Sequence, residues 1–193
     1  MKLLVVSDVH GDYDALEQAY RAEKNVGAVI FLGDGIREAE RFEAAHGALR
    51  VYMVRGNCDF GSNAPIQGLC AFEAVLFLYT HGHAYGVKGS YLALAEAAQA
   101  ARADVALFGH THVPFCEEMD GLTLFNPGAL IEGQYGVICA EEGKARLEHR
   151  HLMRYNTKGK TPGMRNRGFS LLRGISLGVR RNHTENGLRL PFL

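Results

Sequence analysis

The sequence predicts an α/β domain with two packed sheets over residues 1–155, followed by a basic C-terminal extension over residues 156–193. Two observations support this fold class. Residues 1–155 alternate short apolar runs with helix-like segments, as βαβ units do. From residue 115 onward, strand-like runs are instead paired across Asp120-Gly121 and Glu142-Gly143, which are turn signals of antiparallel hairpins.

In the first half of the chain we expect three buried strands and two helices. Uninterrupted apolar runs that end in polar residues predict the strands Lys2–Ser7, Ala28–Leu32 and Leu49–Val54. Tyr13–Lys24 is expected to be a helix because residues 13, 16, 19 and 20 form an apolar stripe, and Asp12 is placed to cap it. Ile36–Ala45 is expected to be the second helix.

In the second half, a loop over Gly61–Gly68 precedes strands within Ala71–Thr80. The Ala- and Leu-rich segment Tyr91–Ala103 predicts a helix with Ser90 as its cap. The remaining strands are expected at Val105–Phe108 and in two hairpins, Phe115–Met119 with Leu122–Phe125 and Tyr135–Ala140 with Lys144–His151.

Composition is that of an ordinary globular protein, with 47% apolar and 22% charged residues. No apolar run approaches the roughly 20 residues that span a bilayer, and the apolar start is too short for a signal peptide. We therefore expect a cytoplasmic protein without a membrane partner. Its four cysteines form no CxxC pair, which favours reduced thiols.

The charge is divided unevenly along the chain. Residues 1–150 hold 12 Lys and Arg against 20 Asp and Glu, a net charge of −8, whereas residues 151–193 hold 9 against 1, a net charge of +8. Such a tail can bind nucleic acid or lipid, or fold onto its own body or onto a second subunit. We favour a homo-oligomer contact, because the tail also carries apolar residues. Nucleic acid is disfavoured, because Phe169 and Phe192 are not interleaved with basic residues as in base-stacking surfaces.

Five short polar clusters follow predicted strands, and ligands of α/β folds gather beyond the carboxyl ends of strands. The clusters are Asp8-Val9-His10, Gly33-Asp34, Gly56-Asn57-Cys58-Asp59, His81-Gly82-His83 and Gly109-His110-Thr111-His112. Each cluster alone is also explained by an ordinary turn or helix cap. Together they offer the carboxylates, amide oxygen and imidazoles that suit Mn, Fe or Zn better than an all-oxygen Ca or Mg site.

Individual positions suggest how two cations would be shared. In an extended segment Asp8 and His10 would project to the same side and could bind one ion together. Asp34 could bridge two cations, and Gly56 would let the backbone turn sharply before Asn57. His110 and His112 are the most specific pair, because packing explains two imidazoles at a strand end poorly.

In this order, the motifs resemble those of the calcineurin-like metallophosphoesterase superfamily, from about Met1 to about Leu152. The closest resemblance is to its small prokaryotic single-domain phosphodiesterase branch, which includes the non-catalytic retromer scaffold subunit. The resemblance implies a four-layer α/β/β/α sandwich of two mixed sheets. It also implies that Asn126-Pro127-Gly128 lies near the site.

The resemblance further implies two divalent metal ions. Asp8, His10, Asp34 and His112 would bind the first, and Asp34, Asn57, His81 and His110 would bind the second. Mn is the expected metal, and Fe, Zn, Ni and Mg are alternatives. A metal-bridging hydroxide would attack the phosphorus of a small phosphate ester in line with the leaving group, with phosphodiesters preferred to phosphomonoesters.

Cys58 stands where many members of the superfamily have a histidine that contacts the phosphate and protonates the leaving group. A thiol suits that task poorly near neutral pH, so we expect weak or narrow catalysis. Asn57 and His83 are the expected catalytic residues, with His83 as a substitute proton donor. The alternative function is a weakly active or inactive protein-binding scaffold with the same fold.

Overall fold

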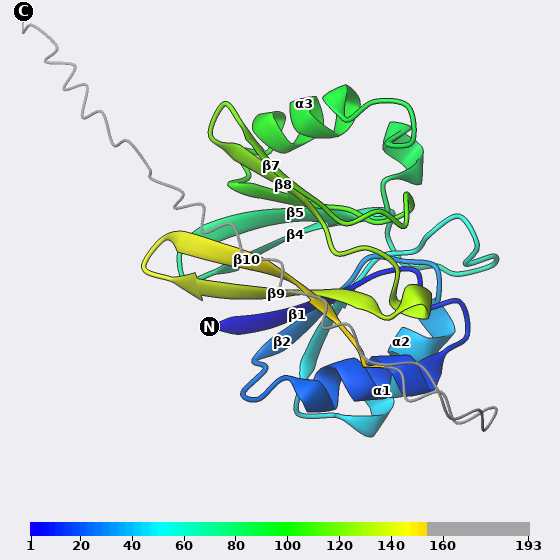
Figure 1. Cartoon of the computed structure of the whole chain (residues 1–193). Coiled ribbons are helices and arrows are strands. Elements are labelled where there is room, and N and C mark those ends of the chain that lie inside the picture. Colours follow the sequence, from blue (N-terminus) through cyan, green and yellow to red (C-terminus); the bar gives the residue numbers. More distant parts are fainter. Residues whose placement is uncertain (154–193) are drawn as a thin grey trace, which may run out of the picture.

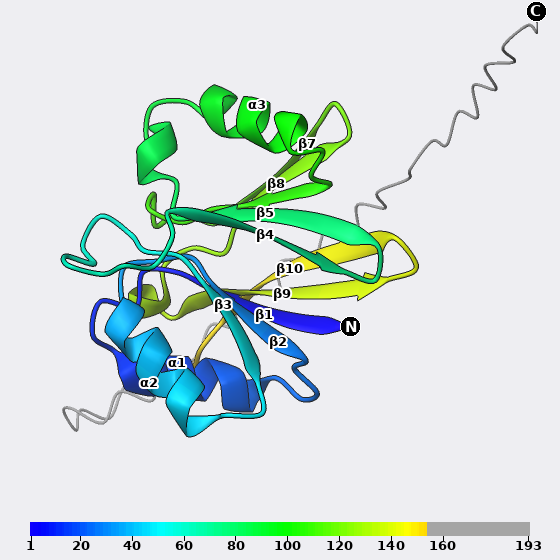
Figure 2. The same cartoon turned by 180° about the vertical axis from the view of Figure 1, so that it is seen from behind.

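The computed structural model describes residues 1–153, which form four layers (Figure 1). Helices α1 (Tyr13–Ala22) and α2 (Ile36–Ala45) cover the outer face of one sheet, and α3 (Leu92–Ala100) covers the outer face of the other. The two sheets pack face to face between them (Figure 2). The expected four-layer α/β/β/α sandwich is confirmed, whereas the predicted C-terminal extension lies outside the described residues.

The first sheet has the strand order β10-β9-β1-β2-β3. Its strands are β1 (Lys2–Val6), β2 (Ala28–Phe31), β3 (Arg50–Met53), β9 (Gln134–Glu141) and β10 (Lys144–His151). Strands β1, β2 and β3 run parallel, whereas β9 is antiparallel to β1 and to β10. The sheet is therefore mixed, with β1 at its centre.

The second sheet has the strand order β4-β5-β6-β8-β7. Its strands are β4 (Gln67–Phe72), β5 (Val75–Thr80), β6 (Val105–Leu107), β7 (Phe115–Met119) and β8 (Leu122–Asn126). Strands β5, β6 and β8 run parallel, and β4 and β7 pair antiparallel at the two edges. Each sheet thus contains three neighbouring parallel strands.

The apolar runs are continuous because both faces of each sheet are covered. In β1, Leu3 and Val5 face the other sheet, where they join a core with Phe77. Leu4 and Val6 point the opposite way and pack with the helices α1 and α2. All four of these β1 side chains are fully buried, so the layers leave the strand ends as the place for polar groups.

The boundaries of several elements differ from the predicted ones. Asp12 caps α1 as expected, accepting the backbone N–H of Ala15 at 3.0 Å. Helix α3 ends before the predicted Ala103, because Arg102 adopts a left-handed φ of 56° and the N–H of Ala103 bonds back to Ala98. Strand β4 starts at Gln67, inside the predicted loop, because it pairs with β5 over its whole length. Two short 3₁₀ helices, His83–Tyr85 and Leu130–Glu132, were not predicted.

The predicted hairpin strands Phe115–Met119 and Lys144–His151 are confirmed to the residue. Within residues 1–153 no helix is long and apolar enough to cross a bilayer.

The four cysteines are free thiols; Cys70 is buried and Cys58 is exposed. Cys116 and Cys139 are half-buried and pack at the margins of the core.

Candidate metal centre

The loops that follow parallel strands of both sheets meet at one edge of the sandwich. They carry the side chains that the sequence singled out. Asp8 and His10 follow β1, Asp34 follows β2, Asn57 follows β3, His81 follows β5, and His110 and His112 follow β6. Hydrogen bonds between the sheets, such as His81 Nδ1–H to the carbonyl of Leu32 at 2.8 Å, hold these loops together.

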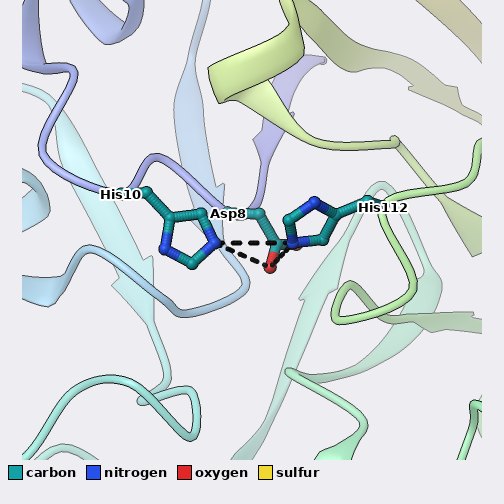
Figure 3. A group of neighbouring side chains, drawn as sticks. All are labelled: Asp8, His10 and His112. Carbon is teal, nitrogen blue, oxygen red and sulfur yellow. Dashed lines mark hydrogen bonds and ion pairs between the residues drawn. The ribbon is translucent and has the colours of Figure 1, made fainter.

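Asp8, His10 and His112 form a first group with potential ligand atoms that all lie within 4.8 Å of one another (Figure 3). Asp8 Oδ1 lies 3.1 Å from His112 Nε2 and 3.8 Å from His10 Nε2. The two Nε2 atoms are 3.4 Å apart. The first sheet supplies Asp8 and His10, and the second sheet supplies His112.

A second group surrounds Asp34. Its Oδ2 lies 3.4 Å from His81 Nε2, which in turn lies 3.2 Å from Asn57 Oδ1. Asp8, Asp34 and His81 have ligand atoms within 4.8 Å of one another. Asp34 Oδ2 is also 4.0 Å from His10 Nε2. Asp34 therefore lies between the two groups, where a carboxylate could serve both.

His110 is placed differently from the other predicted ligands. Its backbone N–H donates to Asp8 Oδ2 at 3.1 Å. Its ring lies beside His81, with centroids 5.0 Å apart. Within residues 1–153 its ring nitrogens join none of the close ligand groups. The ligand role of His110 thus stays a prediction.

Buried neighbours set the charge states at this edge. Burial alone would raise the pKa of Asp34, but hydrogen bonding and charge from His81 and the N–H of Cys58 hold it well below its usual range. Burial would lower the pKa of His81, but Asp34 and Asp8 raise it. Burial, His81 and Lys88 lower the pKa of His110 to about 4. At neutral pH Asp34 is therefore ionised and His110 is neutral, as metal ligands must be.

The donor set fits divalent cations. Asp8 is fully buried, and its Oδ2 accepts hydrogen bonds from Ser7 Oγ at 2.6 Å and from the N–H of His110. Its Oδ1 accepts no hydrogen bond from any described residue, although a buried oxygen normally has a partner. The Nδ1–H of His81 is committed to the carbonyl of Leu32, and its Nε2 lies toward Asp34. A cation bound there would replace the proton on that Nε2. This carbonyl-to-imidazole bond is the usual support of a metal-binding histidine.

Five of the predicted ligands have left-handed backbone conformations: Asp8 (φ 55°), His10 (45°), Asp34 (57°), His110 (67°) and His112 (60°). Such conformations are costly for non-glycine residues and cluster at functional sites. They also correct one expectation, because Asp8 and His10 are not in an extended segment. Their side chains converge because the chain turns at both residues.

Two glycines allow backbone to touch the carboxylates. A Cβ at Gly56 would overlap Asp34 Oδ1, and a Cβ at Gly109 would overlap Ser7 Oγ and crowd Asp8 Oδ2. Gly56 does not have a left-handed φ. The structure shows close approach to the Asp34 carboxylate as the reason for this glycine, and the predicted sharp turn stays a prediction.

Asp59 is the positioning residue that the sequence did not single out, although it lies within the Gly-Asn-Cys-Asp motif. Its two carboxylate oxygens accept four backbone N–H groups, those of Asp34, Gly35, Ile36 and Gly56, at 2.7–2.9 Å. It is buried. A carboxylate inside a metal-binding motif that is not itself an expected ligand could have been the signal, since buried acids need several donors.

Asn126 supports the other side of the site. Its Nδ2 donates to the carbonyl of Gly109 at 2.9 Å and to Thr111 Oγ1 at 3.0 Å, and its Oδ1 accepts the N–H of Gly128. The segment between His110 and His112 is thereby fixed. The expected position of Asn126-Pro127-Gly128 near the site is confirmed.

Cys58 and His83 lie at the margin of the centre. Burial, Asp34 and Asp59 raise the pKa of the Cys58 thiol, so it stays protonated at neutral pH. The His83 ring lies 5.4 Å from that of His81, and burial together with His81 lowers its pKa. Its Nδ1 is buried and has no hydrogen-bond partner among the described residues.

Comparison with known proteins agrees with this geometry. The calcineurin-like phosphoesterase superfamily domain matches residues 1–140. The probable metallophosphoesterase YsnB of Bacillus subtilis (strain 168) is 36% identical over 132 residues, covering 67% of this chain and 75% of YsnB. The phosphodiesterase YfcE of Escherichia coli (strain K12) is 32% identical over 154 residues, covering 67% of this chain and 79% of YfcE.

Among solved structures, wild-type Vps29 of Entamoeba histolytica complexed with zinc superposes with a TM-score of 0.63 at 18% identity, covering 79% of this chain and 93% of Vps29. That similarity shows a shared fold. The matched domain includes every predicted metal ligand, and two relatives above 30% identity carry phosphoesterase names. The chain belongs to the calcineurin-like phosphoesterase superfamily.

Proposed function

We propose that this metal-dependent phosphoesterase uses two divalent cations and prefers phosphodiesters to phosphomonoesters. The observation that carries the proposal is the position of Asp34 between two groups of ligand atoms, with His10 on one side and His81 on the other. A shared carboxylate is the usual bridge in two-metal hydrolytic sites. The name of the relative YfcE supports the preference for diesters.

In this proposal the first ion is bound by Asp8, His10, Asp34 and His112, and the second by Asp34, Asn57, His81 and His110. Mixed carboxylate and imidazole ligands suit Mn, our first expectation, and Fe, Zn, Ni or Mg as alternatives. When bound, the ions would lower the pKa of a water and neutralise charge on the phosphate oxygens.

The residues of the chain would orient the other reactants. Asn57 follows β3 with its Oδ1 directed toward His81, so its amide would position the phosphate for in-line attack by water. The ring of His83 lies beside that of His81, with centroids 5.4 Å apart. His83 would give a proton to the leaving group. The lowered pKa of His83 leaves it mostly neutral at neutral pH. We therefore expect faster turnover of esters whose leaving group departs without a proton.

The alternative is a protein-binding scaffold with little catalysis and the same fold. Retention of both ligand groups favours the enzyme, because a scaffold has no evident use for His10 and His112. The predicted tail, residues 156–193, is proposed as a separate oligomerisation segment of a cytoplasmic protein. Its deletion, followed by measurement of oligomer size and turnover, tests that role.

The function is tested by hydrolysis of bis(p-nitrophenyl) phosphate with and without Mn. We expect Mn-dependent turnover that a chelator abolishes and that Asp34→Ala removes. Asp14→Ala is the matched control, because Asp14 is an exposed acid on α1 outside the centre. Failure of Mn, Fe, Zn, Ni and Mg to support turnover would instead favour the scaffold.

A further inference from the structure

A cleft of about 330 Å³ opens directly beside the metal centre. Its lining includes His10, Asp34 and Cys58 from the centre, together with Ile36, Arg37 and Phe60. The cleft is therefore continuous with the predicted first metal position. A substrate bound to the ions through its phosphate would extend one of its ester groups into this space.

Phe60 is the exposed apolar residue of the cleft. The residue is 88% exposed, so its ring is open to a ligand. Its backbone, in contrast, is firmly held. The N–H of Phe60 bonds to the carbonyl of Cys58 at 3.0 Å, the N–H of Ser62 bonds to the carbonyl of Asp59, and the side chain of Asp59 is fixed by four further bonds. A rigid turn thus presents an uncovered ring next to a hydrolytic site.

Arg37 supplies positive charge to the same cleft. It is exposed in the first turn of α2 and makes no ion pair with any described residue. The N-terminus of α2 adds little positive charge, because the Asp59 carboxylate already accepts the N–H groups of Gly35 and Ile36. Glu38 and Asp59 also line the cleft and limit the total. The cleft therefore combines an aromatic platform with a cation that can face a phosphate.

We infer that the substrate is a phosphodiester bearing a nucleobase-like aromatic group, which stacks on Phe60 while its phosphate lies between the metal centre and Arg37. This inference rests on the proposed function. Stacking on an aromatic side chain suits any base, because every base offers a π face. An aliphatic diester would leave the Phe60 ring uncovered and bind more weakly.

The test compares two phosphodiesters, the methyl ester of adenosine 5′-monophosphate and the methyl ester of ribose 5-phosphate, by calorimetric titration of the full-length Mn-loaded protein. We expect the wild type to bind the nucleotide about tenfold more tightly than the sugar phosphate. Phe60→Ala should reduce that ratio to near one, and Phe60→Trp should restore it. Leu92→Ala is the matched control, because Leu92 is 63% exposed on the opposite outer layer, and it should keep the wild-type ratio.

A wild-type ratio near one would overturn the inference, as would failure of both ligands to bind. Phe60→Ala weakening both ligands equally would also overturn it, because a merely structural role of the turn has that result. The proposed function is read separately, from Mn-dependent turnover of the wild type. Mn-dependent turnover combined with equal binding of the two ligands would therefore contradict this inference and leave the proposed function intact.

Discussion

The carboxylate of Asp59 accepts the backbone N–H of Asp34 at 2.8 Å, so one buried acid holds another in position. The same carboxylate also accepts the backbone N–H groups of Gly35, Ile36 and Gly56. It thereby fixes two loops that follow neighbouring strands, β2 and β3. Asp34 can keep its left-handed conformation because these bonds over-determine it.

Asp59→Ala should therefore weaken both the fold and the metal centre. Four backbone donors lose their acceptor, and leaving even one buried donor unpaired costs about 1–3 kcal/mol. We expect a loss of at least about 2 kcal/mol in the free energy of unfolding without metal, measured by urea titration. We also expect much weaker Mn binding, measured by calorimetry.

Asp104→Ala is the matched control for Asp59→Ala. Asp104 also accepts a backbone N–H, that of Leu76 at 2.7 Å, but in the second sheet away from the centre. It should lower stability without a specific effect on Mn affinity. Equal loss of Mn affinity in both variants would show that Asp59 acts only through global stability.

Gly56→Ala should displace the Asp34 carboxylate, because the new Cβ would overlap Asp34 Oδ1. Overpacking of this kind costs typically about 1–3 kcal/mol, and here the strain falls on a proposed bridging ligand. We expect turnover to fall at least tenfold, the factor that about 1.4 kcal/mol corresponds to. Steady-state kinetics with the aryl diester measures it.

Gly47→Ala is the corresponding control, because a Cβ at Gly47 meets no atom within 4 Å. A surface change of this kind should stay within about 0.5 kcal/mol. Unchanged turnover in Gly56→Ala would mean that Asp34 tolerates displacement, contrary to a tightly shared carboxylate.

His149 should make the metal-free protein less stable in mild acid. Its Nε2–H donates to the carbonyl of Asn126 at 2.8 Å, its ring stacks on Phe125, and burial lowers its pKa. The unfolded chain, with an ordinary histidine pKa of about 6.5, then binds more protons than the folded chain. The free energy of unfolding therefore falls as the pH drops from about 6.5 toward the lowered folded pKa.

His149→Gln should flatten this part of the stability curve, because the replacement does not titrate. Urea titrations at several pH values below 7, in the presence of a chelator, measure the slope. His83 and His110 also have lowered pKa values and contribute with the same sign, so the slope should shrink and not vanish. An unaltered slope in His149→Gln would exclude the burial of a neutral His149 as a cause.

His83→Ala tests the proton donor. General acid catalysis contributes about 10²–10⁴-fold where the leaving group needs a proton. We expect a large loss with an alkyl diester and a small loss with an aryl diester, whose leaving group departs unaided. Turnover of both esters by the same enzyme preparation is the measurement. The same fractional loss with both esters, or no loss with the alkyl ester, would remove His83 from this role.

Much of the fold could be predicted from the sequence, because the layers are covered on both faces and the buried strands read as continuous apolar runs. Ile36–Ala45 and Lys144–His151 agree to the residue with the structure. The end of α3 could not be predicted, because a left-handed Arg102 stops it where no glycine stands. The start of β4 depends on pairing with β5, which local sequence does not encode.

The candidate site shows the same division. Residue types and their positions after strands were enough to predict that Asp8, Asp34 and His81 share one site. The left-handed turns at Asp8 and His10 were missed because they oppose local backbone preference and persist only through tertiary contacts. The role of Asp59 was missed because its partners lie 23 to 25 residues away for Asp34, Gly35 and Ile36.

The arrangement of the cations is tested most directly by anomalous diffraction from crystals grown with Mn. We predict two anomalous peaks about 3.5–4 Å apart, one beside Asp8, His10 and His112 and the other beside Asn57 and His81, with Asp34 between them. A single peak, or peaks that lie away from Asp34, would contradict the shared-carboxylate centre.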